Sequence, residues 1–380
     1  MINSSLTDYI QLVEPYTPST LISPTYWLKI KAVADFLPRN ITSFFGFECP
    51  LGIAEPQSDF LICTDAEASE RKILASENGE LLPELISAPI WQQINQFSKE
   101  WQSQVSILHE KVNNIWLEFD INDYQGDLPL PSCFFGAESL YSRKSPHGNI
   151  ADNDSYEWIT RNAFPLLVNA NLPESVEATF CNCLDLLPPE AYVFQIGLML
   201  ARNIKNQVRV CIRNISPVEI TAYLQQIGWT GAPDILQGFL TELSGLVDRI
   251  DLDIDVGESV APKIGLECYL LQQPKLEPKW QLFLNYLVDR NLCLSSKQAA
   301  LLDYPGFIRE KNYQGIWPSY LAKDLQENNS ESVFFRRIHH IKIVYQNDQP
   351  QLAKAYLAME YFLITSDFVQ HFRELNNSSV

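Results

Sequence analysis

The sequence predicts an α+β protein: a ten-stranded antiparallel barrel built from five strand-pair/helix repeats, with the helices outside. Two observations favour this fold class. Ten apolar runs that alternate like strands come in five pairs, and helical stretches follow each pair. Three of these runs share a Gly-x-Glu within an apolar strand, at Gly46/Glu48, Gly136/Glu138 and Gly265/Glu267. The alternative is that short apolar strands resemble one another by chance.

The predicted elements follow in a regular order along the chain. Residues 1–40 predict an N-terminal arm with one short helix at 26–37, residues 41–375 a single barrel domain, and residues 376–380 a disordered tail. Strand pairs are expected at 43–53 and 59–66, 113–122 and 132–140, 191–202 and 207–214, 248–256 and 263–271, and 339–346 and 351–362. Helices are expected at 81–108, 155–169, 173–186, 216–228, 233–245, 278–291, 295–303 and 365–374. The helix at 216–228 has the clearest start, because Ser216 and Glu219 can form a capping box.

Closure of the strands into a ring follows from their short connections. A short connection makes each pair antiparallel, and a closed ring leaves no exposed edge. One side of each strand is purely apolar and is expected to face the helices. A ten-stranded barrel is too wide for side chains to fill, so the other side should line a chamber. The alternative is an open sheet whose polar side meets water, against which Trp116 and Tyr269 argue, since large aromatic rings are useful in a pocket.

The strand at 113–122 shows the two sides clearly. Ile115, Leu117 and Phe119 form its apolar side. The opposite side, which we expect to point inward, has Trp116, Glu118 and Asp120. On the other strands the residues expected inside are Arg209, Cys211, Arg213, Asp251, Asp253, Asp255, Lys263, Glu267, Tyr269, Lys342, Lys354 and Tyr356.

Composition and charge exclude several classes of function. The chain has 380 residues, of which 46% are hydrophobic and 19% charged, as in a globular protein. A net charge of -18 argues against nucleic-acid binding and against docking on an anionic membrane. No run is apolar enough to span a membrane, and the eight cysteines form no C-x-x-C pair. We therefore expect a soluble, cytoplasmic protein without membrane insertion.

Familiar catalytic motifs are absent from the sequence. It has no nucleotide-binding glycine motif, no G-x-S-x-G and no H-E-x-x-H. A fivefold guanidino-modifying fold competes with the barrel, but it needs a cysteine nucleophile with a histidine, and Cys293 lies on a predicted helix. His339 and His340 precede a predicted strand and could be a base or a ligand, although such a pair is more often a surface or capping feature.

Two further segments have alternative interpretations. Residues 152–157 resemble the start of a calcium loop but fit a helix N-terminus better. The aromatic stretch 303–321 could be a lid or rim loop, or an ordinary connector packed outside the barrel.

Five antiparallel strand pairs with outer helices resemble the ABBA-type aromatic prenyltransferases, which include the dimethylallyltryptophan synthase class. The resemblance covers roughly residues 40–375, and its motif support is Lys354-Ala355-Tyr356, which matches the Lys-x-Tyr strand pattern of that family. It implies an enzyme of natural-product biosynthesis that transfers an isoprenoid group from a prenyl diphosphate to an aromatic small molecule or peptide.

The resemblance also implies roles for the inward residues. Glu118 would be the catalytic residue that holds the acceptor. Tyr269 and Tyr356, with Trp116, would shield the allylic cation, because aromatic faces stabilise a cation. The diphosphate would be bound by Arg209, Arg213, Lys263, Lys342 and Lys354.

The chain departs from the family at two points. It has no second Lys-x-Tyr pair. Three aspartates at 251, 253 and 255 would also repel a diphosphate unless Mg²⁺ bridged the two. In that case Asp253 and Asp255 would be the metal ligands. These aspartates favour the alternative function, a barrel-shaped peptide- or metabolite-binding or tailoring protein without prenyl transfer, because an acidic chamber prefers cationic ligands.

Overall fold

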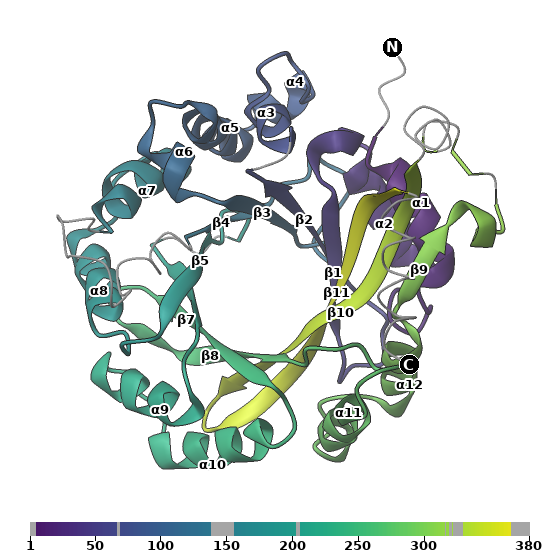
Figure 1. Ribbon diagram of the computed structural model, residues 1–380. Coiled ribbons are helices and arrows are strands. Elements are labelled where there is room, and N and C mark those ends of the chain that lie inside the picture. Colours follow the sequence, from purple (N-terminus) through teal and green to yellow (C-terminus); the bar gives the residue numbers. More distant parts are fainter. Residues whose placement is uncertain are drawn as a thin grey trace.

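Ten antiparallel strands close into a barrel in the computed structural model, as the sequence predicts (Figure 1). The structure describes residues 5–66, 69–137, 156–202, 206–315, 317–318, 321 and 330–365. The strands of the ring are β1 (Phe44–Pro50), β2 (Asp59–Asp65), β3 (Asn114–Phe119), β4 (Ser132–Gly136), β5 (Tyr192–Leu198), β6 (Val208–Arg213), β7 (Arg249–Val256), β8 (Val260–Tyr269), β10 (Ser330–Gln346) and β11 (Gln349–Thr365).

The last two strands close the ring. Neighbours in the sequence pair from β1 to β8, β8 then pairs with β10, and β11 pairs with both β10 and β1. The first and last strands of the chain therefore lie side by side (Figure 1). Every one of these pairings is antiparallel, as we expected for strands joined by short connections.

Helices surround the barrel and cover its apolar side (Figure 1). They are α1 (Thr7–Val13), α2 (Pro24–Ala34), α3 (Glu70–Ala75), α4 (Pro83–Ser87), α5 (Pro89–Gln102), α6 (Ile107–Lys111), the π-helical turn η4 (Ile159–Ala163), α7 (Phe164–Val168), α8 (Glu174–Asp185), α9 (Pro217–Gln226), α10 (Pro233–Ser244), α11 (Lys279–Asp289) and α12 (Ser295–Asp303). The capping box of α9 forms between Ser216 and Glu219.

The hydrophobic core lies between the strands and these helices. Ile115, Leu117 and Phe119 of β3 are buried in it, as their alternation predicts. Two fully buried tryptophans of α5 fill part of the space and satisfy their indole N–H groups, since Trp91 donates to the Pro129 carbonyl and Trp101 to that of Val112, both at 2.7 Å. The N-terminal arm joins the core through α2, where Trp27 packs edge-on against Phe47 of β1 with ring centroids 5.0 Å apart.

Several elements differ from their predicted extent. The helix expected at 81–108 is three helices, because Pro89 starts α5 and Ser106 caps α6. Strand β10 begins at Ser330 rather than at 339, so the β10–β11 hairpin is longer than predicted. A further strand, β9 (Gly306–Arg309), pairs with its added half.

Other segments named in the sequence are placed outside the chamber or outside the described residues. The described part of 303–321 contains β9 and the buried Tyr304 and Ile308, which matches a packed connector. Thr365, the first residue of the helix expected at 365–374, ends β11 instead, and residues 366–374, Glu138, residues 152–155 and the tail 376–380 lie outside the described residues. All eight cysteines are free thiols. None of the described helices combines the length and the apolar character of a membrane span.

Gly46 of β1 tests the closure of the ring. A Cβ at this position would lie 2.5 Å from the Leu357 carbonyl oxygen of β11, a backbone atom that cannot move without shifting the pairing of these strands. We expect Gly46→Ala to lower the free energy of unfolding by about 1–3 kcal/mol, measured by chemical denaturation.

The control for this variant is Gly238→Ala in α10, where a new Cβ meets no atom within 4 Å. Alanine in a helix interior is expected to be neutral or stabilising by up to about 1 kcal/mol. Equal stability of the two variants would contradict the close approach of β1 and β11.

Candidate functional site

The inward sides of the strands enclose two adjoining chambers. The larger, of about 190 Å³, has many aromatic side chains in its walls, and we call it the aromatic chamber; among the residues that line it are Phe44, Trp116, Phe134, Phe194, Tyr269 and His340. The smaller, of about 80 Å³, is lined mainly by charged side chains, and we call it the ionic chamber. Glu118, Arg209, Lys342 and Tyr356 line both, so the two chambers meet at these four residues.

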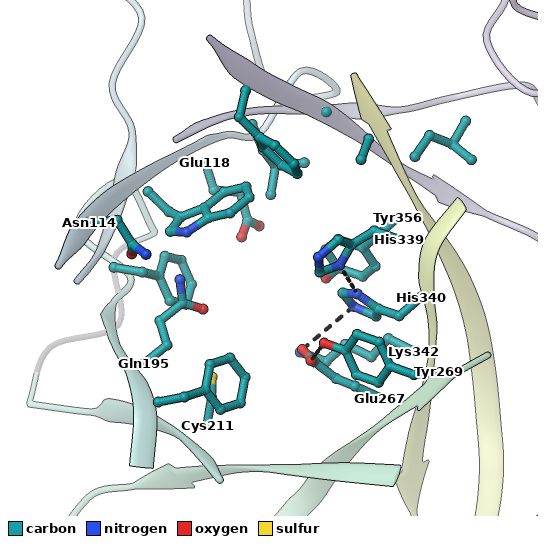
Figure 2. A pocket seen from close by; sticks show the side chains of 18 of the residues that line it. Asn114, Glu118, Gln195, Cys211, Glu267, Tyr269, His339, His340, Lys342 and Tyr356 are labelled. Atoms are coloured by element: carbon teal, nitrogen blue, oxygen red, sulfur yellow. Dashed lines mark hydrogen bonds and ion pairs between the residues drawn. The ribbon is translucent and has the colours of Figure 1, made fainter. Parts of the chain in front are cut away.

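The position along each strand decides which chamber a side chain lines. On β6, Arg209 lies near the start of the strand and lines both chambers, whereas Arg213 at its end lines the aromatic chamber. Inward-pointing residues are two apart along a strand, so they follow one another along the length of the lumen. Residues near one end of a strand therefore line one chamber, and residues near the other end line the other chamber. Figure 2 shows the aromatic chamber, with Glu118 and Gln195 on one wall and Tyr269, His340 and Lys342 on the other.

Ion pairs hold the cations of the ionic chamber. The Arg209 guanidinium donates two hydrogen bonds to Asp255, from Nε at 2.8 Å and from a terminal nitrogen at 3.0 Å, and Lys263 lies 3.5 Å from the same carboxylate. Lys342 pairs with Asp253, and Lys354 pairs with Glu48. Five cationic and four carboxylate side chains line this chamber, namely Arg202, Arg209, Lys263, Lys342, Lys354, Glu48, Glu118, Asp253 and Asp255.

Arg202 adds a further pairing at the edge of the ionic chamber. It donates to Glu118 at 2.6 Å and, through Nε, to Asp120 at 2.8 Å. With Asp120 included, five carboxylates balance the five cations of this region. A bound anion must therefore share its cations with carboxylates that are already in place.

Glu48 shows how strongly such a pair acts in a buried setting. It is 2% exposed and accepts hydrogen bonds from both Lys354 and Tyr356. Burial alone would raise the pKa of Glu48, but the charge and hydrogen bond of Lys354 outweigh burial and lower this pKa to about 2. Glu48 therefore stays ionised and fixes the orientation of the Tyr356 hydroxyl.

Two nearby carboxyl groups shift in the opposite direction. Burial, followed by the charges of Glu48, Glu118 and Asp120, raises the pKa of Asp59 to about 8. Burial and then the charge of Glu48 also raise the pKa of Glu118. An acid such as Asp59, whose pKa lies near neutral pH, is typical of functional sites, where it can take up or donate a proton.

The aromatic chamber has an ordered set of ring contacts. Phe44 meets Trp116 edge-on with centroids 5.2 Å apart, and His340 stacks on Tyr356 at 4.2 Å. The Tyr269 hydroxyl donates to Glu267 at 2.7 Å. Such walls offer ring faces to an aromatic ligand or to a cation.

Arg213 lines the end of the aromatic chamber away from the ionic one, and Arg249 lies beside it. Arg213 lies over the Phe194 ring at 4.1 Å and Arg249 over Tyr269 at 4.0 Å. Both share the buried carboxylate of Asp251, at 3.1 Å and 2.9 Å. Arg213 is thus separated from the ionic chamber. The diphosphate-binding role predicted for Arg213 would require it to lie with the other cations there.

The remaining residues proposed from the sequence all line the lumen. Trp116 and Tyr269 lie in the aromatic chamber, Glu118 and Tyr356 at the junction, and Lys263, Lys354, Asp253 and Asp255 in the ionic chamber, together with the junction residues Arg209 and Lys342. Their individual roles stay predictions.

A resident Mg²⁺ does not fit the two aspartates suggested for it. Asp253 already faces Lys342 and Asp255 faces Arg209 and Lys263. Among the described residues, no three His, Cys, Asp or Glu side chains form a group that could hold a metal ion. We therefore derive no chemistry through a metal.

Sequence reasoning missed several lining residues. Glu48 belongs to the Gly-x-Glu pattern and could have been found by its alternation within β1, whereas Arg202 follows β5 in a loop and gave no signal. The prediction that His339 and His340 lie at a strand entrance, where a surface or capping role is commonest, was wrong. Both lie inside β10 and line the aromatic chamber, and His340 is 5% exposed.

Comparisons with known proteins find similarity only at the level of structure. No protein-family model matches the sequence, and no curated protein matches it. The solved structures that match include 6-dimethylallyltryptophan synthase from Micromonospora olivasterospora in complex with DMASPP and Trp, with 9% sequence identity and a TM-score of 0.43 over 93% of this chain and 95% of that chain. The two chains resemble each other in fold, and no residue role is carried over from that enzyme.

Asp59 allows the electrostatics of the lumen to be tested by stability. A carboxyl group whose pKa is raised on folding holds its proton more tightly in the folded state, so stability is lost as the pH rises from about 4 through about 8. Asp59→Asn removes this loss and keeps the oxygen that accepts from the Ile121 N–H at 2.9 Å. We expect the variant to be more stable than the wild type by about 1–3 kcal/mol at pH 8, with the difference vanishing below about pH 4.

Denaturation curves at several pH values measure this difference. The exposed Asp123 provides the control, because Asp123→Asn changes the same charge outside the lumen. A stability gain that is equal at pH 4 and pH 8, or equal in the two variants, would contradict the raised pKa of Asp59.

Proposed function

We propose that this protein is an aromatic prenyltransferase-like enzyme that transfers an isoprenoid group from a prenyl diphosphate to an aromatic acceptor, a small molecule or a peptide, in natural-product biosynthesis. The observation that supports it is the direct junction of an ionic chamber with an aromatic one. A prenyl diphosphate has the same two parts, an anionic head and an allylic tail that becomes a carbocation.

The cations of the ionic chamber would stabilise the leaving diphosphate. Arg209, Lys342 and Lys354 are fixed by carboxylates before any ligand binds, so their positions cost no reorganisation during the reaction. Lys263, whose side chain is 46% exposed, could follow the ligand as it enters. Arg213 would instead contact the part of the acceptor that reaches its end of the aromatic chamber.

The aromatic chamber would hold the allylic tail and the acceptor. Tyr356 lies at the junction, where its ring can face a carbocation as the C–O bond to the diphosphate breaks. Tyr269 and Trp116 extend this wall and exclude water, which would otherwise capture the cation. Glu118, also at the junction, would accept a hydrogen bond from the acceptor and orient its ring toward the allylic carbon.

A second candidate function is the binding of a cationic aromatic ligand without transfer. The balance of charge favours it, because each cation of the ionic chamber already faces a carboxylate among the described residues. A ligand with an ammonium group could replace one of these cations as the partner of Asp253 or Glu48.

Substitution of Asp253 distinguishes the two candidates by the sign of its effect. Asp253→Asn removes a negative charge and frees Lys342, so an anionic head should bind more tightly and a cationic ligand more weakly. We expect the non-reactive analogue dimethylallyl S-thiolodiphosphate to bind Asp253→Asn about ten-fold more tightly than the wild type, and Arg209→Met about ten-fold more weakly, measured by titration calorimetry. Tryptamine is the cationic probe in a parallel titration.

The control for these titrations is Lys279→Met, which removes an exposed cation on α11, outside the barrel. Binding of tryptamine that weakens in Asp253→Asn, without binding of the diphosphate analogue to any form, would favour the second candidate. Dimethylallyl diphosphate with aromatic acceptors, followed by mass spectrometry, then tests transfer itself.

A further inference from the structure

A β-bulge brings two neighbouring histidines into the same chamber. Consecutive residues of a regular strand face opposite sides of the sheet. In β10, however, Ile338 pairs with Leu357 and His340 with Tyr356 of β11, so His339 is an extra residue in the ladder. His339 and His340 both line the aromatic chamber as a result, while Ile338 stays in the outer core. Bulges of this kind commonly redirect side chains at functional sites.

The side chain of Gln273 holds the bulge in place. Its amide donates to the Ile338 carbonyl at 3.0 Å and accepts from the Ile338 N–H at 2.8 Å. This stretch of β10 lies between the residues that pair with β9, which end at Arg336, and those that pair with β8, which begin at Ile341. Gln273 therefore supplies the two hydrogen bonds that a neighbouring strand would make there.

The two histidines lie in a row that ends at Glu267 of β8, which faces His340 from beyond hydrogen-bond distance. Nδ1 of His339 lies 2.7 Å from Nδ1 of His340, and Nε2 of His340 lies 3.6 Å from a Glu267 carboxylate oxygen. Figure 2 shows this chain of contacts along one wall of the aromatic chamber, opposite Glu118 and Gln195. Stacking on Tyr356, with ring planes inclined by 18°, fixes the His340 ring.

Glu267 determines where the protons of this pair lie. A hydrogen bond between two Nδ1 atoms needs one donor and one acceptor, so the neutral pair has two possible arrangements. The Glu267 carboxylate favours a proton on the facing Nε2 of His340, which leaves its Nδ1 as the acceptor. His339 must then donate from Nδ1, and its Nε2 has the free lone pair.

We propose that His339, His340 and Glu267 form a proton relay in which Nε2 of His339 accepts the proton that an alkylated aromatic ring loses. The proposal rests on the proposed prenyl transfer and adds a base to it. In that role His339 would be a catalytic residue, and Gln273 a positioning residue that acts through the bulge.

The proposed step is balanced in protons and electrons. Attack of the ring on the allylic carbon gives a cationic ring, and the C–H bond at the alkylated carbon then breaks while its electron pair restores aromaticity. The released proton binds Nε2 of His339 while the Nδ1 proton of His339 passes to Nδ1 of His340, which becomes an imidazolium whose Nε2–H faces the Glu267 carboxylate at 3.6 Å. The positive charge of the ring thereby moves to His340, where the Glu267 carboxylate offsets it.

The surroundings of the pair keep both histidines neutral and able to accept a proton. Burial, and then the charge of Lys342, lowers the pKa of His340 to about 3, with Asp253 and Glu48 acting in the opposite sense. Burial, His340, Arg337, Arg213 and Arg249 lower the pKa of His339 well below its usual range. Such weak bases suffice because a cationic ring is a far stronger acid than an imidazolium.

Nitrogen-15 NMR of histidine-labelled protein tests the relay without any substrate. Ring correlations distinguish the two tautomers, and His339→Gln and His340→Gln assign the signals among the five histidines. We expect neutral His339 with its proton on Nδ1 and neutral His340 with its proton on Nε2 at pH 7. The opposite tautomers, or an imidazolium at either residue, would overturn the relay.

Gln273→Leu tests the role of the bulge in the same measurement. It removes the amide while keeping most of the side-chain volume, and we expect the tautomer pattern of the pair to be lost. Gln281→Leu on the exposed face of α11 is the matched control. An unchanged pattern in Gln273→Leu would remove Gln273 from the proposal.

Product partition provides the second readout, with dimethylallyl diphosphate and tryptophan as probes. If the wild type transfers, we expect His339→Gln to yield about ten-fold less alkylated product per diphosphate released, with more prenyl alcohol, because loss of the proton slows while ionisation continues. His109→Gln, on α6 outside the barrel, should keep the wild-type ratio. An unchanged ratio in His339→Gln would refute the relay but not the transfer.

Failure of the wild type to bind dimethylallyl S-thiolodiphosphate or to form product would refute the proposed function itself, and with it the catalytic use of the relay. The tautomers measured by NMR would still decide whether the two Nδ1 atoms share a hydrogen bond with His339 as the donor.

Discussion

Closure of the ring by β11 is the constraint on which the rest of the structure depends. This strand pairs with β1 on one side and β10 on the other, which joins the two ends of the chain's sheet. Once the ring is closed, each strand must present one side to the helices and the other to a common lumen. Most of the charged residues that point inward are then largely shielded from water, so their ion pairs offset the cost of burying them.

The fold was predictable because its signal has a period of two and repeats along the chain. The alternation of β3 gave the inward position of Glu118, and the same parity placed Arg209 and Lys342 correctly in the lumen. The added half of β10 was missed, because the strand was predicted to begin at 339 whereas it begins at Ser330. The break of the 81–108 helix at Pro89 was visible in the sequence and was overlooked.

The site was less predictable than the fold, for reasons that lie in the structure. A bulge changes the parity of a strand without any residue type that marks it, so nothing in the sequence shows that His339 and His340 share a chamber. Pairing partners are equally hidden, since Asp253 faces Lys342 from a strand nearly ninety residues away. A periodic pattern assigns a side to each residue but assigns no partner across a ring.

The carboxylates of the lumen bear on the function more than the cations do. An unpaired cation is costly in a buried chamber. A site that binds an anion through buried cations therefore needs carboxylates that pair with these cations while no anion is bound. When the anion binds, the negative charge of these carboxylates must be offset. Burial raises the pKa of Glu118 and of Asp253, so both carboxyl groups hold a proton more readily than a solvent-exposed acid does. Glu48, whose pKa is lowered, stays charged and keeps Lys354 and Tyr356 in position. The acids of the lumen therefore divide into a fixed anion that anchors its neighbours and groups whose negative charge is disfavoured by burial.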